Sequence, residues 1–124
     1  MRYRSADFSD LVGKTLTKIH NNNDDILTFT TTEGAVYRMM HHQNCCESVS
    51  IEDIIGDLSD LEGTPILEAR EDSGDLPPKD DYDDCYDWTF YNIRTIKGSV
   101  TIRWYGTSNG YYSTKADFEV LHNG

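Results

Sequence analysis

The 124-residue sequence has no long apolar run and few basic residues. No stretch approaches the ~20 apolar residues that a membrane-spanning helix needs, and no apolar stretch follows Met1–Ser5 as a signal peptide would require. Lys and Arg number 11 against 22 Asp and Glu, which gives a net charge of −11. Because phosphate backbones are held mainly by Lys and Arg, this composition argues against direct binding of nucleic acid. We expect no membrane partner and no nucleic-acid partner.

Cysteine is also scarce, since the chain contains only Cys45, Cys46 and Cys85. The number is odd and two of the three are adjacent, and a disulfide between chain neighbours needs a strained backbone. Reduced thiols or thiolate ligands fit this pattern better than a disulfide framework. We therefore expect a protein of the reducing cytoplasm.

The acidic residues are concentrated in one block. Residues 52–84 contain 13 acidic and 2 basic residues, so this segment alone carries a net charge of −11 and the rest of the chain is neutral overall. Such a field accelerates association with a basic protein and weakens with salt. The expected partner contacts are Asp80, Asp81, Asp83 and Asp84. A second interpretation is that the acidity serves solubility alone.

The first third of the chain predicts three antiparallel strands. Residues 14–20, 26–32 and 35–40 are rich in β-branched and aromatic residues, which favour strands. The Asn- and Asp-rich residues 21–25 and the Glu33–Gly34 pair predict the two turns between them. These strands would form a β-meander.

The last third predicts a second meander. Residues 87–95, 99–105 and 111–121 have strand composition, and Val100, Ile102 and Trp104 alternate with polar neighbours. The Asn109–Gly110 pair is a typical two-residue hairpin turn.

The middle of the chain predicts a helix and a loop. Ser50 and Asp53 have the spacing of a helix N-terminal capping box, and Gly56 is a natural helix stop. A further strand is expected near residues 65–69, and the acidic residues 71–84 with Pro77–Pro78 predict a solvated loop. The predicted fold is a single α+β domain over residues 1–124, mostly antiparallel β, with two meanders, one short helix and one acidic loop.

Candidate chemistry lies where His41, Cys45 and Cys46 fall within six residues. Zinc binds sulfur and nitrogen ligands tetrahedrally, so this cluster predicts a structural zinc ion. Cys85 could supply the fourth ligand, and Glu47, Asp53 or a water are alternatives. His42 competes with His41, because strand alternation places the two on opposite faces.

Catalysis is the competing interpretation. Cys46 could be a thiol nucleophile with His41 or His42 as its base, which would require a lowered thiol pKa and an oxyanion site. The carboxylates show no spaced calcium loop. Because no substrate-pocket constellation is apparent, we expect a binding protein and not an enzyme.

Three runs of the sequence resemble a phage and prophage domain family of unknown function. They span Tyr37–Val49, Ile51–Leu58 and Thr95–Ser113. The family pattern reads HxQDCCE, then EDIxGDLxDL, then TWTFYxxxTIKGxVTIRWYGxSNGYYS. The resemblance places the family histidine at His41; Asn44 stands where the family more often has Asp.

The resemblance implies a class of function by analogy. Small acidic phage proteins of this kind include anti-CRISPR proteins of type II-A, some of which hold zinc. We therefore expect an inhibitor that binds a Cas9-type nuclease in the bacterial cytoplasm and blocks target-DNA loading, since such nucleases hold nucleic acid in basic channels. The alternatives are a small zinc- or thiol-dependent hydrolase and a phage structural or morphogenetic protein.

Overall fold

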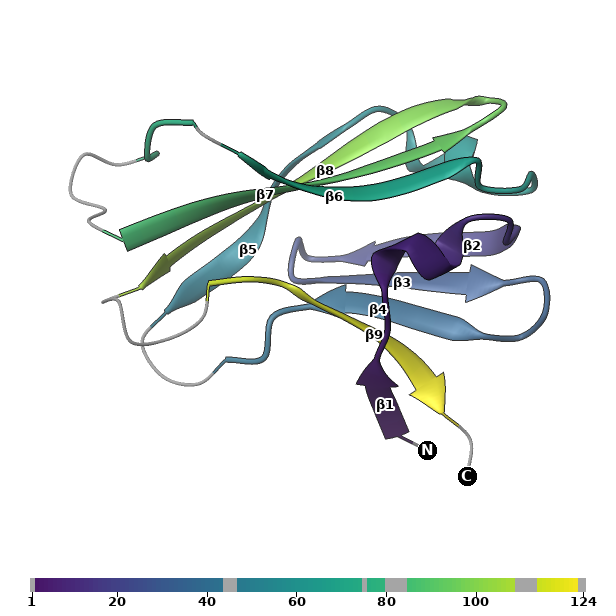
Figure 1. Cartoon of the computed structure of the whole chain (residues 1–124), viewed down its shortest axis with the longest axis horizontal. Helices are drawn as coiled ribbons and strands as arrows, with labels where there is room; N and C mark the ends of the chain where they lie inside the picture. The colour runs from purple at the N-terminus through teal and green to yellow at the C-terminus, as the bar shows by residue number, and fades with distance from the viewer. Residues whose placement is uncertain (1, 44–46, 75, 80–84, 109–113, 123–124) are drawn as a thin grey trace.

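The protein is a sandwich of two antiparallel sheets, as seen in a computed structural model (Figure 1). The structure describes residues 2–43, 47–74, 76–79, 85–108 and 114–122. The first sheet has the strand order β1 (Arg2–Ser5), β9 (Asp117–His122), β4 (Val36–Met40), β3 (Ile26–Thr31) and β2 (Leu16–Asn22). The second has the order β5 (Ser48–Ile55), β8 (Gly98–Ser108), β7 (Cys85–Thr95) and β6 (Glu68–Gly74). Two 3-10 turns, η1 (Phe8–Leu11) and η2 (Leu58–Leu61), join strands within a sheet.

The predicted first meander is present as β2, β3 and β4. Alternate residues of β3 are buried, so Leu27, Phe29 and Thr31 face the other sheet. Asn23 and Asp24 have φ values of 55° and 60° in the turn before β3. These are left-handed conformations that Asn and Asp tolerate better than most residues, which explains the turn.

The predicted second meander is only half correct. Strands β7 and β8 form the expected hairpin, but β9 pairs with β1 and β4 in the other sheet. Phe118 of β9 stacks on Tyr37 with ring centroids 5.3 Å apart, and its edge meets Phe29 and Phe8. This aromatic packing holds β9 in the first sheet. The Asn109–Gly110 pair lies outside the described residues.

The predicted helix after Ser50 is wrong. These residues form β5, which pairs antiparallel with β8, Ser50 opposite Tyr105 and Asp53 opposite Arg103. Asp53 Oδ1 accepts a hydrogen bond from the adjacent Ile54 N–H at 2.8 Å and caps no helix. No α-helix occurs among the described residues, so the α+β assignment is replaced by a mostly antiparallel β fold.

The predicted acidic loop begins later than expected. Residues 71–74 belong to β6, an edge strand that pairs with β7. The strand expected near residues 65–69 therefore starts at Glu68 and continues into the acidic segment. Charged side chains suit an edge strand because they discourage pairing with other chains.

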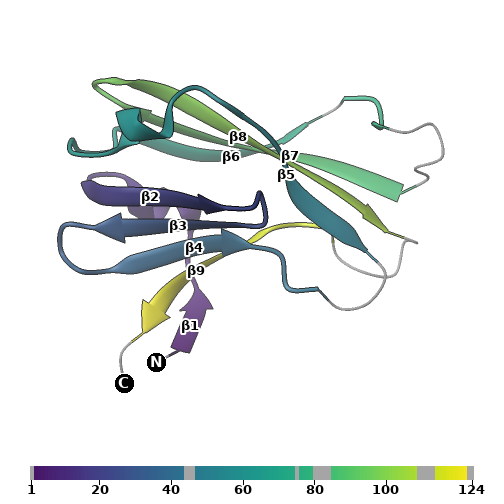
Figure 2. The ribbon, with the colours of Figure 1, turned by 180° about the vertical axis from the view of Figure 1, so that it is seen from behind.

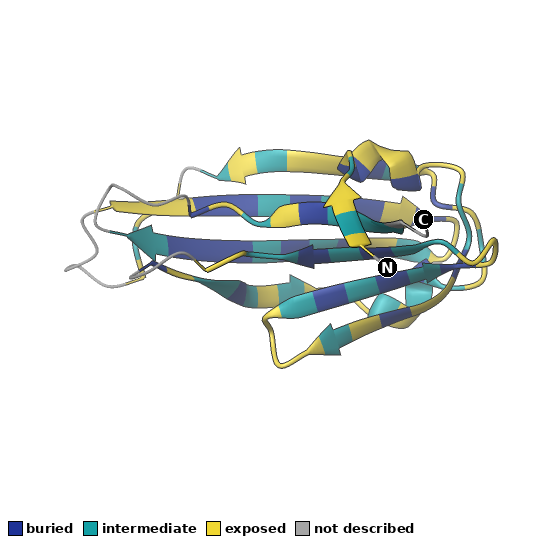
Figure 3. Cartoon of the chain, turned by 90° about the horizontal axis from the view of Figure 1, so that it is seen from below, coloured by how far each residue is buried: buried dark blue, intermediate teal, exposed yellow. Residues whose placement is uncertain are grey.

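The core lies between the two sheets. Figure 3 shows buried residues alternating with more exposed ones along the strands. Both sheets contribute fully buried side chains, among them Leu27, Phe29, Tyr91, Ile102 and Trp104. Removing such apolar surface from water is the main stabilising term of folding, at roughly 25 cal/mol per Å².

Consecutive described strands change sheet twice. The chain passes from β4 to β5 through residues 41–47, and from β8 back to β9 through residues 109–116. The strand ends that these passages connect, the end of β4 with the start of β5 and the end of β8 with the start of β9, lie toward the same end of the sandwich in the two opposite views (Figures 1 and 2). We call the two passages the first and second crossover. In the described part of the chain, no helix is long and apolar enough to cross a membrane.

Candidate functional site

The residues at the two ends of the first crossover form a buried polar pair. His41 follows β4 and Glu47 precedes β5, and His41 Nε2 lies 2.7 Å from Glu47 Oε2. Their side chains are 3% and 0% exposed. Burying a carboxylate costs free energy unless it is paired and hydrogen-bonded, so this contact is needed to hold Glu47 between the sheets.

The same histidine connects the two crossovers. His41 Nδ1 lies 2.7 Å from the main-chain carbonyl oxygen of Lys115 in the second crossover. A carbonyl oxygen can only accept, so Nδ1 carries a proton and Nε2 is the nitrogen that faces Glu47. Nε2 thus faces the Glu47 carboxylate at 2.7 Å within a buried polar pair.

Gln43 completes the surroundings of Glu47. Its Nε2 lies 3.4 Å from Glu47 Oε1 and also donates to the main-chain carbonyl of Glu47. Both carboxylate oxygens thus have a polar neighbour. An imidazole nitrogen and a carboxylate that converge in a buried place are ligands that zinc accepts. A backbone carbonyl on the other ring nitrogen is the usual way a metal-binding histidine is oriented.

The predicted ligands are only partly described. Cys45 and Cys46 lie outside the described residues. Cys85 is an exposed thiol at the start of β7, opposite Ser108. Within the described ranges, no three His, Cys, Asp or Glu side chains lie close enough to hold a metal ion. The sequence named Glu47 only as an alternative ligand, yet it is the described side chain that meets His41.

His42 has a different environment. Its side chain is 50% exposed, and its Nε2 lies 3.0 Å from Glu119 Oε2. Partial burial raises the pKa of Glu119, but hydrogen bonds from Arg38 and His42 outweigh it and hold the pKa below its usual value. The two histidines therefore lie in different environments as expected, with His41 inside and His42 at the surface, although both follow the end of β4 at Met40.

The expected partner contacts Asp80, Asp81, Asp83 and Asp84 lie outside the described residues. The residues just before them are described. Trp88 Nε1 donates to the carbonyl oxygen of Pro77 at 3.1 Å, and the Lys79 N–H donates to Tyr105 Oη at 3.1 Å. The segment Leu76–Lys79 therefore crosses the outer face of the second sheet, which the sequence did not indicate.

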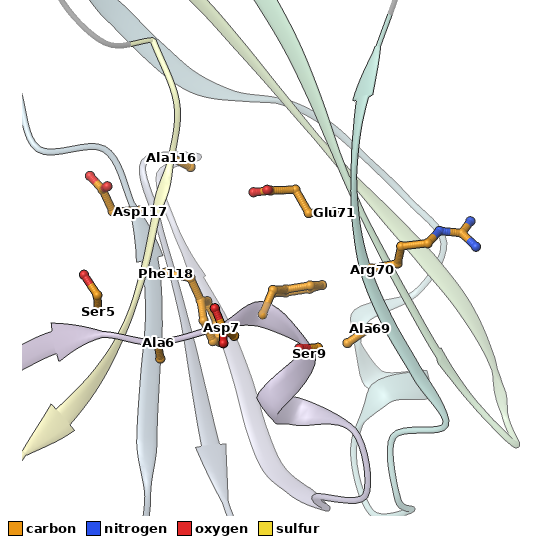
Figure 4. Close-up of a pocket in the computed structure, with 11 residues that line it drawn as sticks. Ser5, Ala6, Asp7, Ser9, Ala69, Arg70, Glu71, Ala116, Asp117 and Phe118 are labelled. Carbon is orange, nitrogen blue, oxygen red and sulfur yellow. The ribbon is translucent and has the colours of Figure 1, made fainter.

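A cleft of about 490 Å³ opens between β6 and the β1–β9 edge of the first sheet. Phe8 and Phe118 are among its lining residues. Figure 4 shows Glu71 reaching from β6 into this space while Arg70 points away. Burial raises the pKa of the Tyr91 hydroxyl, and its hydrogen bond to Glu71 raises it further. Sequence reasoning missed this cleft because it placed Glu71 in a solvated loop.

The two layers of the sandwich differ in charge. Residues 48–108, which contain the second sheet, carry 14 acidic and 5 basic residues, a net charge of −9. The remaining residues carry 8 acidic and 6 basic residues, a net charge of −2. Nine of these acidic residues and all five basic ones lie in the described part of residues 48–108, a net charge of −4, and the other five acidic residues lie outside the described residues.

The fold and site define an antiparallel β-sandwich whose two crossovers meet at a buried histidine–glutamate pair. Residues 9–118 match the model of a family described as a domain of unknown function, DUF7448, and the chain belongs to that family. No curated protein and no solved structure matches the chain.

Proposed function

We propose that this protein acts by binding a strongly basic partner protein through the layer formed by residues 48–108, and that the partner is a Cas9-type nuclease. The observation that carries the proposal is the charge difference between residues 48–108, which contain the second sheet, and the rest of the chain, −9 against −2. A protein with one strongly acidic side approaches a basic surface in a preferred orientation and at an increased rate.

The described arginines of this layer are engaged within it. Arg103 contacts Glu52 at 2.6 Å and Arg94 contacts Glu68 at 3.3 Å. Arg70 bridges Glu68 and Asp72. Since these cations are balanced by neighbouring acids, the excess carboxylates set the sign of the field that a partner meets.

A Cas9-type nuclease suits this charge. Such effectors hold the guide–target heteroduplex in a positively charged channel. An acidic layer bound at that channel or beside it competes with DNA phosphates for the same Lys and Arg side chains. Occupying the basic channel of the nuclease is enough to inhibit target-DNA loading, so this chain needs no catalytic activity.

Direct binding at several salt concentrations tests the proposal. The protein is titrated into purified, guide-loaded type II-A nucleases, and target-DNA loading is followed by gel shift. We expect binding at low salt, weaker binding as salt rises, and a loss of DNA loading. The triple variant Asp81→Asn, Asp83→Asn, Asp84→Asn should bind more weakly and with a smaller salt dependence.

The matched control removes the same charge from the other layer. The control variant carries Asp24→Asn and Asp25→Asn in the turn between β2 and β3, and Glu33→Gln in the turn between β3 and β4. It should leave the affinity for the nuclease nearly unchanged. Equal losses in the two triple variants would show that net charge matters and the acidic layer does not. An absence of binding to every nuclease at low salt would refute the proposed partner.

We also propose that the first crossover holds a structural zinc ion, with His41, Cys45, Cys46 and Glu47 as ligands. His41 and Glu47 already converge at 2.7 Å in a buried position, and His41 Nδ1 is held by the Lys115 carbonyl. The two cysteines lie between them in the sequence, and Cys46 is bonded directly to Glu47. Zinc there would supply folding free energy by tying together the two ends of the first crossover.

Metal analysis and chelation test the zinc site. Protein purified without added zinc should contain about one equivalent, and a chelator should lower the melting temperature. Cys45→Ser with Cys46→Ser should abolish both effects, whereas Cys85→Ser, which removes the exposed thiol of β7, should change neither. A metal-free preparation with an unchanged melting curve would rule the site out.

A further inference from the structure

The outer face of the second sheet carries a row of aromatic side chains. Trp88 of β7 lies opposite Tyr105 of β8 in the strand register, and their ring centroids are 4.5 Å apart. Tyr86 of β7 also stacks on Tyr105 with centroids 6.2 Å apart, and the Arg103 guanidinium lies 5.4 Å from the Trp88 ring. We call Tyr86, Tyr105 and Trp88 the aromatic row.

The row lies on the solvent side of the sheet, yet its centre is covered. Trp88 is 6% exposed and Tyr105 is 9% exposed. The described cover is the chain's own segment Leu76–Lys79, which we call the strap. Leu76, Pro77 and Lys79 of the strap are themselves exposed, so the strap is a thin layer and not part of a second core.

Two hydrogen bonds between described residues hold the strap, and both use its backbone. Trp88 Nε1 donates to the Pro77 carbonyl, and the Lys79 N–H donates to Tyr105 Oη, each at 3.1 Å. Pro78 lies between these anchors, at the position whose nitrogen has no hydrogen to donate. The aromatic row therefore binds the carbonyl of one strap residue and the N–H of the residue two positions later. The residue between these two can be a proline, because its nitrogen is not used.

Proline chemistry suits this arrangement. Proline fixes its own φ near −65° and confines the preceding residue to extended conformations, so Leu76 and Pro77 enter the row pre-organised as extended chain. Proline-rich segments that bind aromatic faces in other proteins exploit the same low entropy cost. The strap has the composition of such a ligand.

The charge of the strap also complements its surroundings. Lys79 is the sole basic residue between positions 71 and 93. Its Nζ lies 5.8 Å from the centroid of the Tyr105 ring, within reach of a cation–π contact. The segment that contains the strap and the second sheet, residues 48–108, carries a net charge of −9. A ligand for this row should therefore combine prolines with a following cationic residue.

We propose that the aromatic row is a recognition site for a proline-rich segment of a partner protein with a basic residue after the prolines. The strap Leu76–Lys79 occupies this site in cis and is displaced when the partner segment binds. The inference rests on the contacts of the strap and does not depend on the nuclease proposed above.

The geometry of β6 allows such an exchange. Gly74, the last residue of β6, lies opposite Trp88. A Cβ at this position would lie 2.0 Å from a carbon of the Phe90 ring and 2.9 Å from Trp88 Cβ. The chain therefore ends β6 close against the rings, where a larger side chain would not fit, and the strap lies beyond the last residue of β6 and outside its pairing with β7.

Peptide binding to a variant with a weakened strap tests the inference. Pro77→Gly with Pro78→Gly keeps the chain intact but removes the pre-organisation of the cis ligand. A synthetic peptide containing Leu-Pro-Pro-Lys should bind this variant at least about tenfold more tightly than it binds the wild type, because the competing cis state is less populated. The same peptide with alanines in place of prolines is the control and should bind at least about fivefold more weakly, since it must be ordered on binding.

Trp88→Phe in the weakened-strap background tests the anchor. It keeps an aromatic ring but removes the N–H donor, and a lost hydrogen bond of about 1 kcal/mol corresponds to about fivefold weaker peptide binding. No binding of the proline peptide at millimolar concentration, or equal binding of both peptides, would show that the strap is a structural cover only.

The wild-type protein provides a second measurement that does not need the variants. In a two-dimensional NMR titration with millimolar peptide, the Trp88 indole N–H signal should move. The Trp104 indole N–H, which donates to the Met39 sulfur in the core, is an internal control and should not move. An unchanged Trp88 signal together with a variant that fails to bind would overturn the inference.

Discussion

Glu47 is a residue whose substitution should strongly destabilise the protein. Its side chain is fully buried at the end of the first crossover, and its described partners His41 and Gln43 lie at the start of it. Removing one partner of a buried ion pair leaves the other uncompensated, at a cost of about 3–5 kcal/mol. We expect Glu47→Gln to lower the free energy of unfolding by about 3 kcal/mol, measured by urea denaturation with a chelator present so that metal does not contribute.

The matched control for Glu47 is Glu52→Gln. Glu52 pairs with Arg103 on the second sheet, where the two side chains are 20% and 26% exposed and water reaches the pair. Solvent screening limits such pairs to about 0–1 kcal/mol. Similar losses in the two variants would show that burial does not strengthen the His41–Glu47 contact.

Tyr91 should make the protein sensitive to alkaline pH. Burial, followed by the hydrogen bond to Glu71, raises the pKa of the folded Tyr91 hydroxyl well above its usual value. The unfolded chain releases this proton near pH 10 while the folded chain retains it. Stability is therefore full below about pH 10 and falls above it, by up to about 1.4 kcal/mol per pH unit from this group.

Urea midpoints measured between pH 8 and pH 11 test the role of Tyr91. Tyr91→Phe should be less stable than the wild type at pH 8, because Glu71 loses a hydrogen-bond donor. Its stability should then fall less steeply above pH 10. Parallel curves for the two proteins would assign the alkaline loss to other tyrosines.

At the scale of elements, the end of β5 depends on a glycine. Gly56 has a φ of 113°, and a Cβ there would lie 2.6 Å from the main-chain oxygen of Ser99 in β8. An added methyl group would thus meet backbone that cannot rotate away. We expect Gly56→Ala to lower stability by about 3 kcal/mol, from backbone strain and overpacking together, as measured by thermal and urea unfolding.

A substitution at Gly34 distinguishes the cost of backbone strain from the cost of overpacking. Gly34 has a φ of 90° in the turn between β3 and β4, and a Cβ added there would have no neighbour within 4 Å. Gly34→Ala meets only the cost of a positive φ, about 1 kcal/mol. A Gly34→Ala loss as large as that of Gly56→Ala would contradict the close approach of β5 to β8.

Element type was predictable where the pattern was local. The hairpins β2–β3, β3–β4 and β7–β8 follow from alternation and from short turns rich in Asn, Asp and Gly. The β5 segment was misread because Ser50, Asp53 and Gly56 mimic helix caps within seven residues. The conformation of this segment was decided by its pairing with β8, which lies about 50 residues later in the chain.

At the scale of the whole molecule, the net charge of −11 opposes folding by self-repulsion. Salt shortens the range of this repulsion, to about 10 Å at 0.1 M. We expect the melting temperature to rise between 0.05 M and 0.5 M NaCl, measured by calorimetry. The Asp81, Asp83 and Asp84 triple variant should show a smaller rise, and a melting temperature that falls with salt would mean that ion pairs dominate.

The sequence predicted part of the candidate site. His41 stood out because it precedes two cysteines, and its distinction from His42 followed from strand alternation. Its contact with Lys115 was not visible, because 74 residues separate the two. The cover of Trp88 by Pro77 was also missed, because the pattern of residues 71–84 indicates only a polar loop.

By itself, the sequence determined the strand-rich composition, the local hairpins, the single acidic block and the scarcity of cysteine. Each of these depends on neighbours within a few residues or on simple counts. The tertiary structure decided that residues 50–55 are a strand, that β9 joins the first sheet, and that both crossovers meet at His41. These outcomes depend on which distant surfaces bury one another, and local pattern carries no information about that choice.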